Sequence, residues 1–209
     1  MSRVFYGIDI SKHNKVLSWA SVNDDNNIDF IILRAGGNYN GFYKDTKFEQ
    51  YYNACKMYGI PVGAYYDCGK EFFSLNAGLE CAKHFRGLLS GKQLEMPVYM
   101  DIEVTPSKYR KYITDAASAF CSYMETHKYF VGIYASDISG FKERLDFDRV
   151  KQFSTWVARY GKKPEYIENP AMWQYSSSGK VNGIFGPVDL DKTNIDFPKI
   201  IKRGCFNGY

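Results

Sequence analysis

Hydrophobic residues recur along the chain in eight short runs with the composition of β-strands. The runs are rich in Val, Ile, Tyr and Phe, which favour strands. Several of them, such as "PVYMDIE" at residues 97–103, begin apolar at nearly every position, as strands buried on both faces do. The pattern predicts strands at residues 4–10, 29–35, 60–67, 96–103, 129–135, 154–160, 171–176 and 186–191.

Between the first strands the hydrophobic period changes to that of amphipathic helices. Residues 45–59, 74–91 and 112–128 each place apolar side chains three or four positions apart, on one helix face. Residues 140–153 predict a weaker helix, and residues 16–25 leave room only for a short one. After residue 160, about ten residues separate neighbouring strands, which is too few for a helical crossover.

Alternating strands and helices predict a parallel sheet with the helices outside. Eight strands with a helix-poor final third predict an α/β fold, an irregular TIM-like barrel of five β/α units followed by three strands lacking helices. An open doubly wound sheet is the structural alternative. No linker or repeat divides residues 1–197, so we interpret them as one domain, followed by a basic tail at residues 198–209.

Composition excludes several classes of protein. The net charge of +4 comes from scattered Lys and Arg residues without a basic stripe, so we expect no nucleic-acid partner. No apolar run approaches the ~18 residues of a membrane span, and the N-terminus lacks the apolar core of a signal peptide. We therefore expect no membrane insertion, and synthesis in the cytoplasm without a recognisable signal peptide. The five cysteines form no C-x-x-C pair and are typical of reduced core residues.

Acidic residues collect at the predicted ends of four strands. In barrels the active site lies at the carboxyl ends of the strands, so these acids predict a functional cleft. The last two acids of "PVYMDIE" are two positions apart and point to the same face of the strand, where each raises the pKa of the other. The acids are Asp9, Asp67, Asp101, Glu103, Asp189 and Asp191.

Two chemistries use such a cleft. Carboxylates bind Mg²⁺, and a pair of carboxyl groups, one of them protonated, hydrolyses glycosidic bonds. The aromatic fraction of 17% favours a sugar, because aromatic rings stack on sugar rings, although the same residues also suit strands. A phosphate-handling metal site would add a Gly-rich loop or basic clamps, and only Arg34 is obviously placed to help. We therefore predict no metal site.

Several ordered motifs resemble those of the glycoside hydrolase family 25 lysozymes, the muramidases of phage endolysins and bacterial autolysins. They are "GIDIS" (7–11), "FIILRAG" (30–36), "GIPVGAYY" (59–66), "PVYMDIE" (97–103), "WVARY" (156–160) and "MWQYSSSGKVNGIFGPVDLD" (172–191). The resemblance implies cleavage of the β-1,4 bond between N-acetylmuramic acid and N-acetylglucosamine in bacterial peptidoglycan, without a cofactor. It also implies an irregular barrel of five β/α units and three further strands.

The resemblance also assigns expected roles to residues. Glu103 matches the general acid, Asp101 the second carboxylate of the pair, and Asp9 and Asp189 the two remaining cleft acids. Asp191 stands where the family often has Asn. The residues that the resemblance and the strand pattern suggest for substrate binding are Tyr65, Tyr134, Trp173, Gln174, Arg34 and Asp191.

Alternative functions remain open at this point. A chitinase-like glycosidase also carries a catalytic Glu at the end of its fourth strand, but its D-x-x-D-x-D-x-E pattern would need acids where this chain has Met96 and Tyr99. A sugar-binding module without turnover is a third possibility. If the chain is a lysozyme, it acts on the bacterial cell wall, and the basic tail is a possible linker to a wall-binding domain outside this chain.

Overall fold

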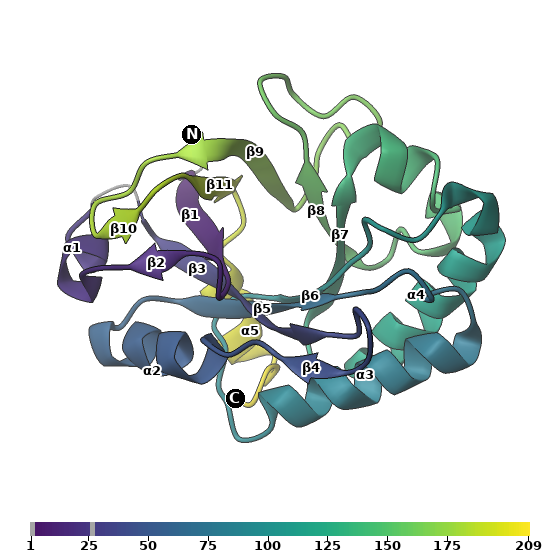
Figure 1. Ribbon diagram of the computed structural model, residues 1–209, viewed down its shortest axis with the longest axis horizontal. Coiled ribbons are helices and arrows are strands. Elements are labelled where there is room, and N and C mark those ends of the chain that lie inside the picture. The colour runs from purple at the N-terminus through teal and green to yellow at the C-terminus, as the bar shows by residue number, and fades with distance from the viewer. Residues whose placement is uncertain (1–2, 26–27) are drawn as a thin grey trace.

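In the computed structural model, which describes residues 3–25 and 28–209, eight strands close into a barrel (Figure 1). The strand β1 pairs with both β3 and β11, which closes the ring and excludes the open sheet. The predicted barrel is confirmed, and residues 1–2 and 26–27 of the predicted domain 1–197 lie outside the described residues. The barrel strands are β1 (Phe5–Ile10), β3 (Phe30–Gly37), β5 (Val62–Asp67), β6 (Val98–Asp101), β7 (Val131–Ser136), β8 (Ser154–Ala158), β9 (Met172–Gly179) and β11 (Val188–Thr193).

Among the eight barrel strands, one runs in the direction opposite to that of the other seven. Each neighbouring pair from β1 through β3, β5, β6, β7 and β8 to β9 is parallel. The last strand, β11, runs antiparallel to both β9 and β1. The connection from β8 to β9 is a loop without a helix, as predicted. The link from β9 to β11 carries the short strand β10 (Ile184–Phe185), which pairs with β2 (Lys15–Val16).

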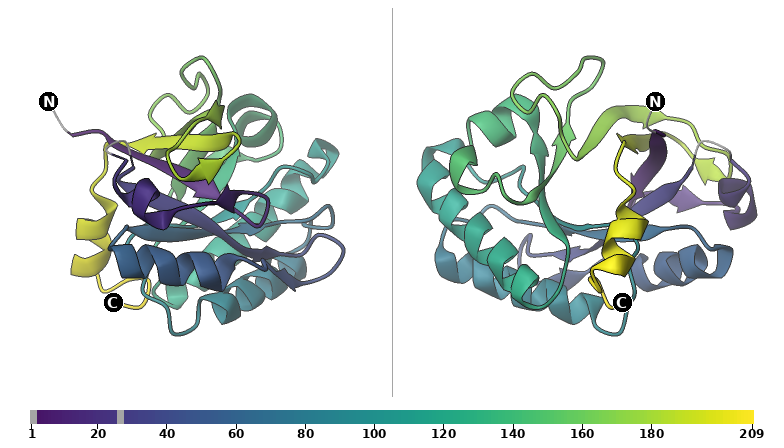
Figure 2. Two further views of the ribbon diagram at one scale, coloured as in Figure 1. Left: turned by 60° about the vertical axis from the view of Figure 1, so that its left-hand side comes forward. Right: turned by 180° about the vertical axis from the view of Figure 1, so that it is seen from behind.

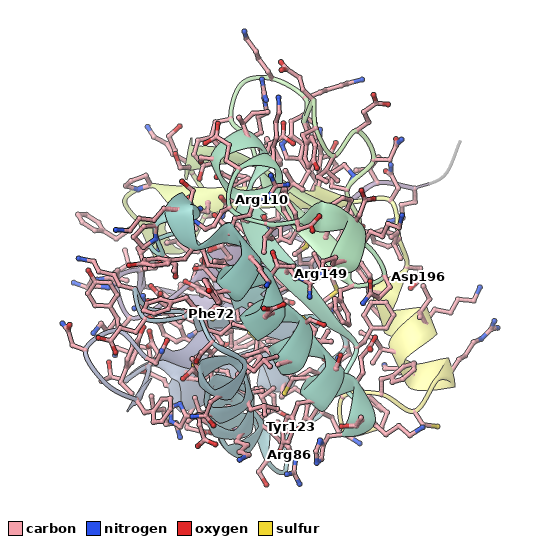
Figure 3. The ribbon with its side chains drawn as sticks, turned by 90° about the vertical axis from the view of Figure 1, so that its right-hand side faces the viewer. Phe72, Arg86, Arg110, Tyr123, Arg149 and Asp196 are labelled. Carbon is pink, nitrogen blue, oxygen red and sulfur yellow. The ribbon has the colours of Figure 1, made fainter. Side chains whose placement is uncertain are left out.

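Helices cover the outside of the barrel where the sequence predicts them. Helix α3 begins at the N-cap Ser74, whose Oγ accepts from the amide of Ala77 (3.0 Å), and α2 ends at Gly59 in the left-handed conformation. Helices α3 and α4 lie side by side (Figure 3). Position 78 requires a glycine for this approach, since a Cβ there would lie 2.2 Å from the carbonyl oxygen of Ala116. The helices are α1 (Trp19–Asn23), α2 (Phe48–Tyr58), α3 (Leu75–Leu89) and α4 (Arg110–Thr126).

The fifth predicted helix, at residues 140–153, is not an α-helix. The segment contains a π-helical turn (Asp137–Lys142) and a 3-10 turn (Phe147–Arg149). Its buried residues Phe141, Leu145 and Val150 do not fall on one face of an α-helix. Instead the amide of Asp146 donates to Thr114 Oγ1 (2.9 Å), which turns the chain back over α4.

The alternation of the strands separates two cores. One lies between the barrel and the helices, and the other fills the barrel interior with large side chains such as Tyr99 and Trp156. Short β4 (Tyr43–Lys44) extends the sheet beside β3.

The C-terminal residues cover the end of the barrel at which the parallel strands begin, and Figure 2 shows this end from behind. Helix α5 (Phe197–Arg203) places Phe197 in the interior core, against the ring of Phe130 (5.7 Å between centroids). Beyond it, the buried Asn207 accepts from the amide of Phe130 (2.8 Å) and donates to the carbonyl of Met96 (2.9 Å). The basic tail is therefore packed against the barrel through Asn207, and a role as linker to a further domain stays a prediction.

Candidate functional site

A cavity of about 90 Å³ opens at the end of the barrel where the parallel strands finish. Eight side chains line it, and four of them are acids. Trp156 forms the centre of its aromatic lining, with the rings of Tyr134 and Tyr65 at 4.4 and 6.0 Å between centroids. The lining residues are Asp9, Tyr65, Asp101, Glu103, Tyr134, Trp156, Gln174 and Asp189.

Strand register explains why the four acids meet. Asp9 stands near the end of β1, directly opposite Asp189 on β11. Asp101 ends β6, and Glu103 follows just beyond the strand. The sequence placed Asp189 at the carboxyl end of the last strand, and this is wrong, because Asp189 is the second residue of β11. Since β11 is antiparallel to β1 and β9, its first residues lie at the mouth, and Asp189 lines the cavity.

A hydrogen-bonded chain holds the polar side chains beside Asp9. The hydroxyls of Tyr134 and Tyr160 both donate to Gln174 Oε1, each at 2.8 Å. With its oxygen fixed in this way, the Gln174 amide donates through Nε2 to Asp9 Oδ2 (2.7 Å). The orientation of Gln174 and of one oxygen of Asp9 is therefore set before any substrate binds.

Every acid of the cavity has a raised pKa. Burial, together with the nearby Asp189, raises the pKa of Asp9 to about 8. Burial and then the charge of Glu103 raise the pKa of Asp101 well above its usual range. Burial also raises the pKa of Asp189. Because several carboxyl groups share one enclosed space, they retain protons at pH values where a solvated carboxyl is ionised.

Glu103 differs from the acids beneath it. The residue stands at the rim and is exposed to solvent, whereas Asp9 and Asp101 are buried. Desolvation of its carboxyl raises the pKa of Glu103, the charge of Asp67 adds to the rise, and Arg144 opposes it. The sequence predicted that Asp101 and Glu103 perturb each other. In the structure the charge of Glu103 raises the pKa of Asp101, whereas the charge that raises the pKa of Glu103 most is that of Asp67.

Asp191 lies inside the barrel and does not line the cavity. Its Oδ1 accepts from the indole Nε1 of Trp156 (2.8 Å), and its buried Oδ2 meets no hydrogen-bond donor in the described part of the chain. The carboxyl group of Asp9 lies within hydrogen-bonding reach. Two carboxylates cannot donate to each other, so this contact requires a proton on one of them. Burial and the charge of Asp9 raise the pKa of Asp191 well above its usual range, which supplies that proton.

Arg34 also stands outside the cavity lining. Its Nε donates to the buried Asp45 (2.8 Å), and its Nη1 lies 3.9 Å from Asp67. Tyr43 donates to the same carboxylate of Asp67 (2.8 Å). Arg34 is therefore placed to hold Asp67, one of the charges that act on Glu103.

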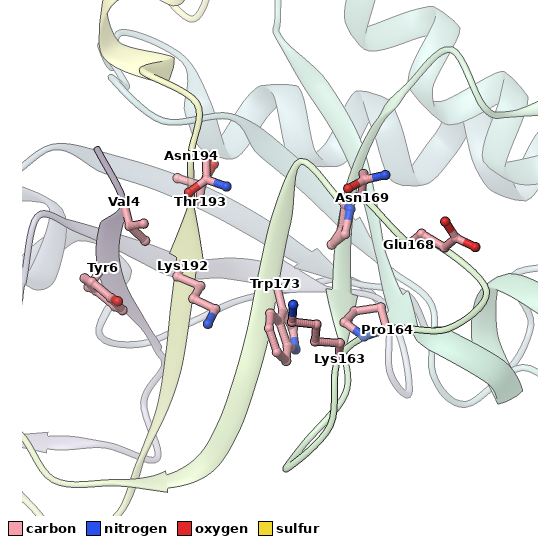
Figure 4. A pocket seen from close by; sticks show the side chains of 11 residues that line it. Val4, Tyr6, Lys163, Pro164, Glu168, Asn169, Trp173, Lys192, Thr193 and Asn194 are labelled. Atoms are coloured by element: carbon pink, nitrogen blue, oxygen red, sulfur yellow. The ribbon is translucent and has the colours of Figure 1, made fainter. Parts of the chain in front are cut away.

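Trp173 points away from the cavity, on the outer face of β9 (Figure 4). Neighbouring residues of a strand face opposite sides, so Gln174 in the interior requires Trp173 outside. The indole Nε1 of Trp173 donates to the carbonyl of Arg159 (2.8 Å), and Lys192 Nζ lies 4.3 Å from the ring centroid. The structure thus separates Trp173 from the other residues that the sequence grouped as a sugar groove.

Arg144 is a residue near the site that the sequence did not single out. It comes from the irregular segment after β7 and donates to the carbonyls of Thr105 (2.7 Å) and Ile102 (3.3 Å), on either side of Glu103. Trp156 was also missed as a lining residue, although its position in the alternation of β8 places it inside the barrel. For Arg144 no periodic signal exists, because the segment is neither strand nor regular helix.

The described residues contain neither a candidate metal cluster nor a membrane-spanning helix. Within residues 3–25 and 28–209, no group of three or more His, Cys, Asp or Glu side chains is arranged to hold a metal ion. Over the same ranges, the helices are too short or too polar for any of them to cross a membrane.

Comparisons relate the barrel to known proteins. Residues 8–184 match the family model "Glycosyl hydrolases family 25". Over 151 residues the chain is 30% identical to the autolytic lysozyme of Clostridium acetobutylicum, which covers 72% of this chain and 44% of that protein. Over 200 residues it is 25% identical to lysozyme M1 of Streptomyces globisporus, covering 90% and 67% of the two.

The chain is also similar to a solved structure of an endolysin. The crystal structure of the CTP1L endolysin superposes with a TM-score of 0.81 at 26% identity, over 95% of this chain and 70% of that one. The chain thus spans less than half the length of the autolytic lysozyme that it matches.

Proposed function

Because the chain belongs to the glycosyl hydrolases family 25, we propose that it cleaves the β-1,4 bond between N-acetylmuramic acid and N-acetylglucosamine in bacterial peptidoglycan. The observation that carries this proposal is the grouping of four acids around one aromatic-lined cavity. A polar, ring-lined space with a protonated carboxyl at its rim suits a glycosidic bond. The lysozymes among its relatives support the choice of peptidoglycan.

Glu103 is the proposed general acid. It stands at the exposed rim, where the leaving oxygen of a long glycan reaches it, and desolvation of its carboxyl raises its pKa, which favours the protonated form. Arg144 holds the carbonyls on both sides of Glu103, which fixes the direction of the carboxyl. Desolvation raises the pKa of Glu103 most, the charge of Asp67 adds to the rise, and Arg144 opposes it.

Asp101 is the proposed partner of Glu103. The charge of Glu103 raises the pKa of Asp101, so the two carboxyls are linked electrostatically. With the proton on Glu103, Asp101 carries the negative charge beneath the sugar and stabilises the cationic carbon that forms when the bond breaks. The buried Asp101 Oδ1, which has no hydrogen-bond partner among the described residues, is available for this contact.

The substitution Glu103→Gln tests the proposal. It removes the transferable proton with little change of shape, so we expect at least a ~100-fold loss of lytic rate on a purified peptidoglycan suspension. The circular dichroism spectrum and melting temperature should stay those of the wild type. The matched control Glu125→Gln changes an exposed carboxyl on α4 and should lyse normally. Wild-type clearing by Glu103→Gln would remove Glu103 from this role.

Product analysis separates the competing functions. Digestion of peptidoglycan followed by borohydride reduction should place the new reducing ends on N-acetylmuramic acid. Reducing ends on N-acetylglucosamine, or faster cleavage of chitin oligomers, would favour the chitinase-like alternative. Binding of glycan without new reducing ends would indicate a sugar-binding module.

The stereochemical course follows from the position of Asp101. It sits two residues from Glu103 at the end of the same strand, so we propose that the 2-acetamido oxygen of the substrate attacks the sugar carbon while Asp101 stabilises the cation. This route retains the β-configuration. Proton NMR of the first product should show the β-anomer before mutarotation, and an initial α-anomer would exclude the route.

The proposed substrate places the action of the protein at the bacterial cell wall. Synthesis in the cytoplasm and a wall-binding domain beyond residue 209 remain predictions from the sequence. Mass spectrometry of the protein from its native source would test both, through its N-terminal residue and its total length.

A further inference from the structure

The outer face of β9, β11 and β1 carries an ordered row of side chains. In the described part of the chain no helix lies over this face, which helices would cover in a regular barrel (Figures 1 and 2). Strand register places Tyr6 beside Lys192 and Lys192 beside Trp173, so one residue from each strand forms the row. Lys192 Nζ lies 4.3 Å from the Trp173 ring centroid and 5.0 Å from that of Tyr175.

A pocket of about 350 Å³ opens beside this row, and we name it the outer pocket (Figure 4). Its second wall is the loop between β8 and β9, which replaces the missing helix. The outer pocket is larger than the acidic cavity, and it lies on the opposite side of the same strands. Its lining residues are Val4, Tyr6, Lys163, Pro164, Glu168, Asn169, Pro170, Trp173, Lys192, Thr193 and Asn194.

Two ammonium groups of the outer pocket have no counter-charge. Neither Lys163 nor Lys192 forms an ion pair with any Asp or Glu among the described residues, whereas Lys44, Lys56 and Lys92 each do. Glu168 also lines the pocket, but Figure 4 shows its carboxylate turned away from Lys163. Burial and the charge of Lys163 lower the pKa of Lys192, as expected for two cations that face one space. An anion between them would relieve this repulsion.

We propose that the outer pocket binds the phosphate groups of a polyol-phosphate polymer of the cell wall, through Lys163 and Lys192. Lysine ammonium groups are compact charges that suit a tetrahedral phosphate, whereas planar carboxylates favour the fork of arginine. Tyr6 and Trp173 offer apolar surface to the carbon chain between phosphates, and Asn169 and Asn194 offer amides to its hydroxyls. The choice of a wall polymer rests on the proposed function, and the phosphate contact rests on the pocket itself.

Such a site would tether the protein to the wall without using the acidic cavity. The two sites lie on opposite faces of β9 and β11, so a polymer in the outer pocket leaves the cavity open to glycan. Tethering raises the local concentration of the glycan strand for the catalytic site.

A glycerol phosphate oligomer of defined length is the probe, because it contains no glycosidic bond. Its binding therefore does not depend on the proposed hydrolysis. Calorimetric titration at low salt should show an affinity that falls as salt is added, since exposed charges are screened. The double variant Lys163→Gln/Lys192→Gln should bind at least ~10-fold more weakly, because each exposed ion pair with phosphate contributes up to about fivefold in affinity. Its melting temperature and its lysis of phosphate-free peptidoglycan should match the wild type.

The control variant Lys111→Gln/Lys142→Gln removes the same charge from exposed lysines on α4 and the π-helical turn, and should bind like the wild type. Equal binding by the wild type and the Lys163→Gln/Lys192→Gln variant would overturn the proposal. So would equal affinity for a DNA oligomer of the same charge, which would indicate attraction to any polyanion. Lysine-dependent binding to phosphate-free peptidoglycan instead would overturn the choice of phosphate.

Discussion

Strands β9 and β11 present opposite chemistry on their two faces. Toward the barrel interior they contribute Gln174, Asp189 and Asp191, which join Asp9 in a network of hydrogen bonds and raised pKa values. Toward the outside they carry Trp173 and Lys192, and the ammonium group of Lys192 lies over the Trp173 ring in contact with solvent. The same backbone thus holds a crowded acidic face and an aromatic basic face.

The comparison shows how enclosure changes the chemistry of a charged side chain. Inside the barrel a carboxyl is separated from water, so it keeps a proton or shares one with a neighbour. Outside, the side chain of Lys163 is exposed to solvent. Substitutions on the inner face should therefore change catalysis and stability strongly, and substitutions on the outer face weakly.

The largest effect is expected at Asp101. Asp101→Asn keeps the shape of the side chain and removes the charge proposed to stabilise the cationic sugar. We expect a ~10²–10³-fold lower kcat on soluble peptidoglycan fragments, with KM nearly unchanged, because the interaction is made mainly in the transition state. Steady-state kinetics measure both constants. A rise in KM at normal kcat would show that Asp101 binds the ground state instead.

Asp191 should affect stability rather than the chemical step directly. Asp191→Leu leaves the buried Trp156 N–H without an acceptor, which should lower the free energy of unfolding by about 1–3 kcal/mol. Asp191→Asn keeps an acceptor for Trp156 and a donor for Asp9, so its stability should lie within about 1 kcal/mol of the wild type. Urea unfolding measures these differences.

The matched control for Asp191 is the next residue on the same strand. Lys192→Leu changes the outer face and should alter the unfolding free energy by less than about 1 kcal/mol. If Asp191→Leu and Asp191→Asn were equally stable, the hydrogen bonds at Asp191 would not contribute to the fold. If Lys192→Leu were as destabilising as Asp191→Leu, the contrast between the two faces would fail.

The raised pKa of Asp9 predicts a dependence of stability on pH. A carboxyl that titrates near pH 4 in the unfolded chain and at about 8 in the fold binds more protons when folded. Its contribution is therefore complete below about pH 4 and is lost as the pH rises to about 8. The pKa values of Glu49, Glu95 and Asp137 are lowered instead. Their contributions to stability are complete above about pH 4.5 and are lost only as the pH falls below it.

Urea unfolding at pH 5 and pH 8 checks this dependence. The wild type should be less stable at pH 8, and Asp9→Asn should reduce the difference, since an amide does not titrate. Asp148→Asn, at a solvated surface position, should keep the wild-type difference. An unchanged difference in Asp9→Asn would show that Asp9 is ionised in the fold at both pH values.

The sequence predicted the inner face better than the outer one. Strand-end positions were enough to bring Asp9, Asp101 and Glu103 to one mouth, because parallel strands of similar length finish at the same level. Asp189 reached the mouth although its strand runs the other way, since it is the second residue of a strand that begins at the mouth. Trp173 was grouped with Gln174 by motif, and the simple alternation of β9 already separates them.

The remaining features depend on irregular structure that no periodicity encodes. Arg144 and Asp67 act on Glu103 from segments after β7 and at the end of β5. The helical pattern over residues 140–153 predicted a regular helix, and so it did not predict the turn that brings Arg144 to the carbonyls on either side of Glu103. The proton between Asp9 and Asp191 follows from burial, which becomes visible only once the barrel is closed.

The smallest effect is expected at Trp173, and it sharpens the comparison most directly. Trp173→Ala removes the aromatic surface outside the barrel, and Trp173 is not among the residues that line the acidic cavity. We expect kcat/KM on soluble peptidoglycan fragments to change by less than about twofold, because the indole makes no contact in the transition state. The neighbouring substitution Gln174→Ala, which breaks the hydrogen bond to Asp9, should lower kcat/KM by at least ~10-fold. A loss of activity in Trp173→Ala as large as in Gln174→Ala, at equal thermal stability, would mean that the glycan also contacts the outer face of β9.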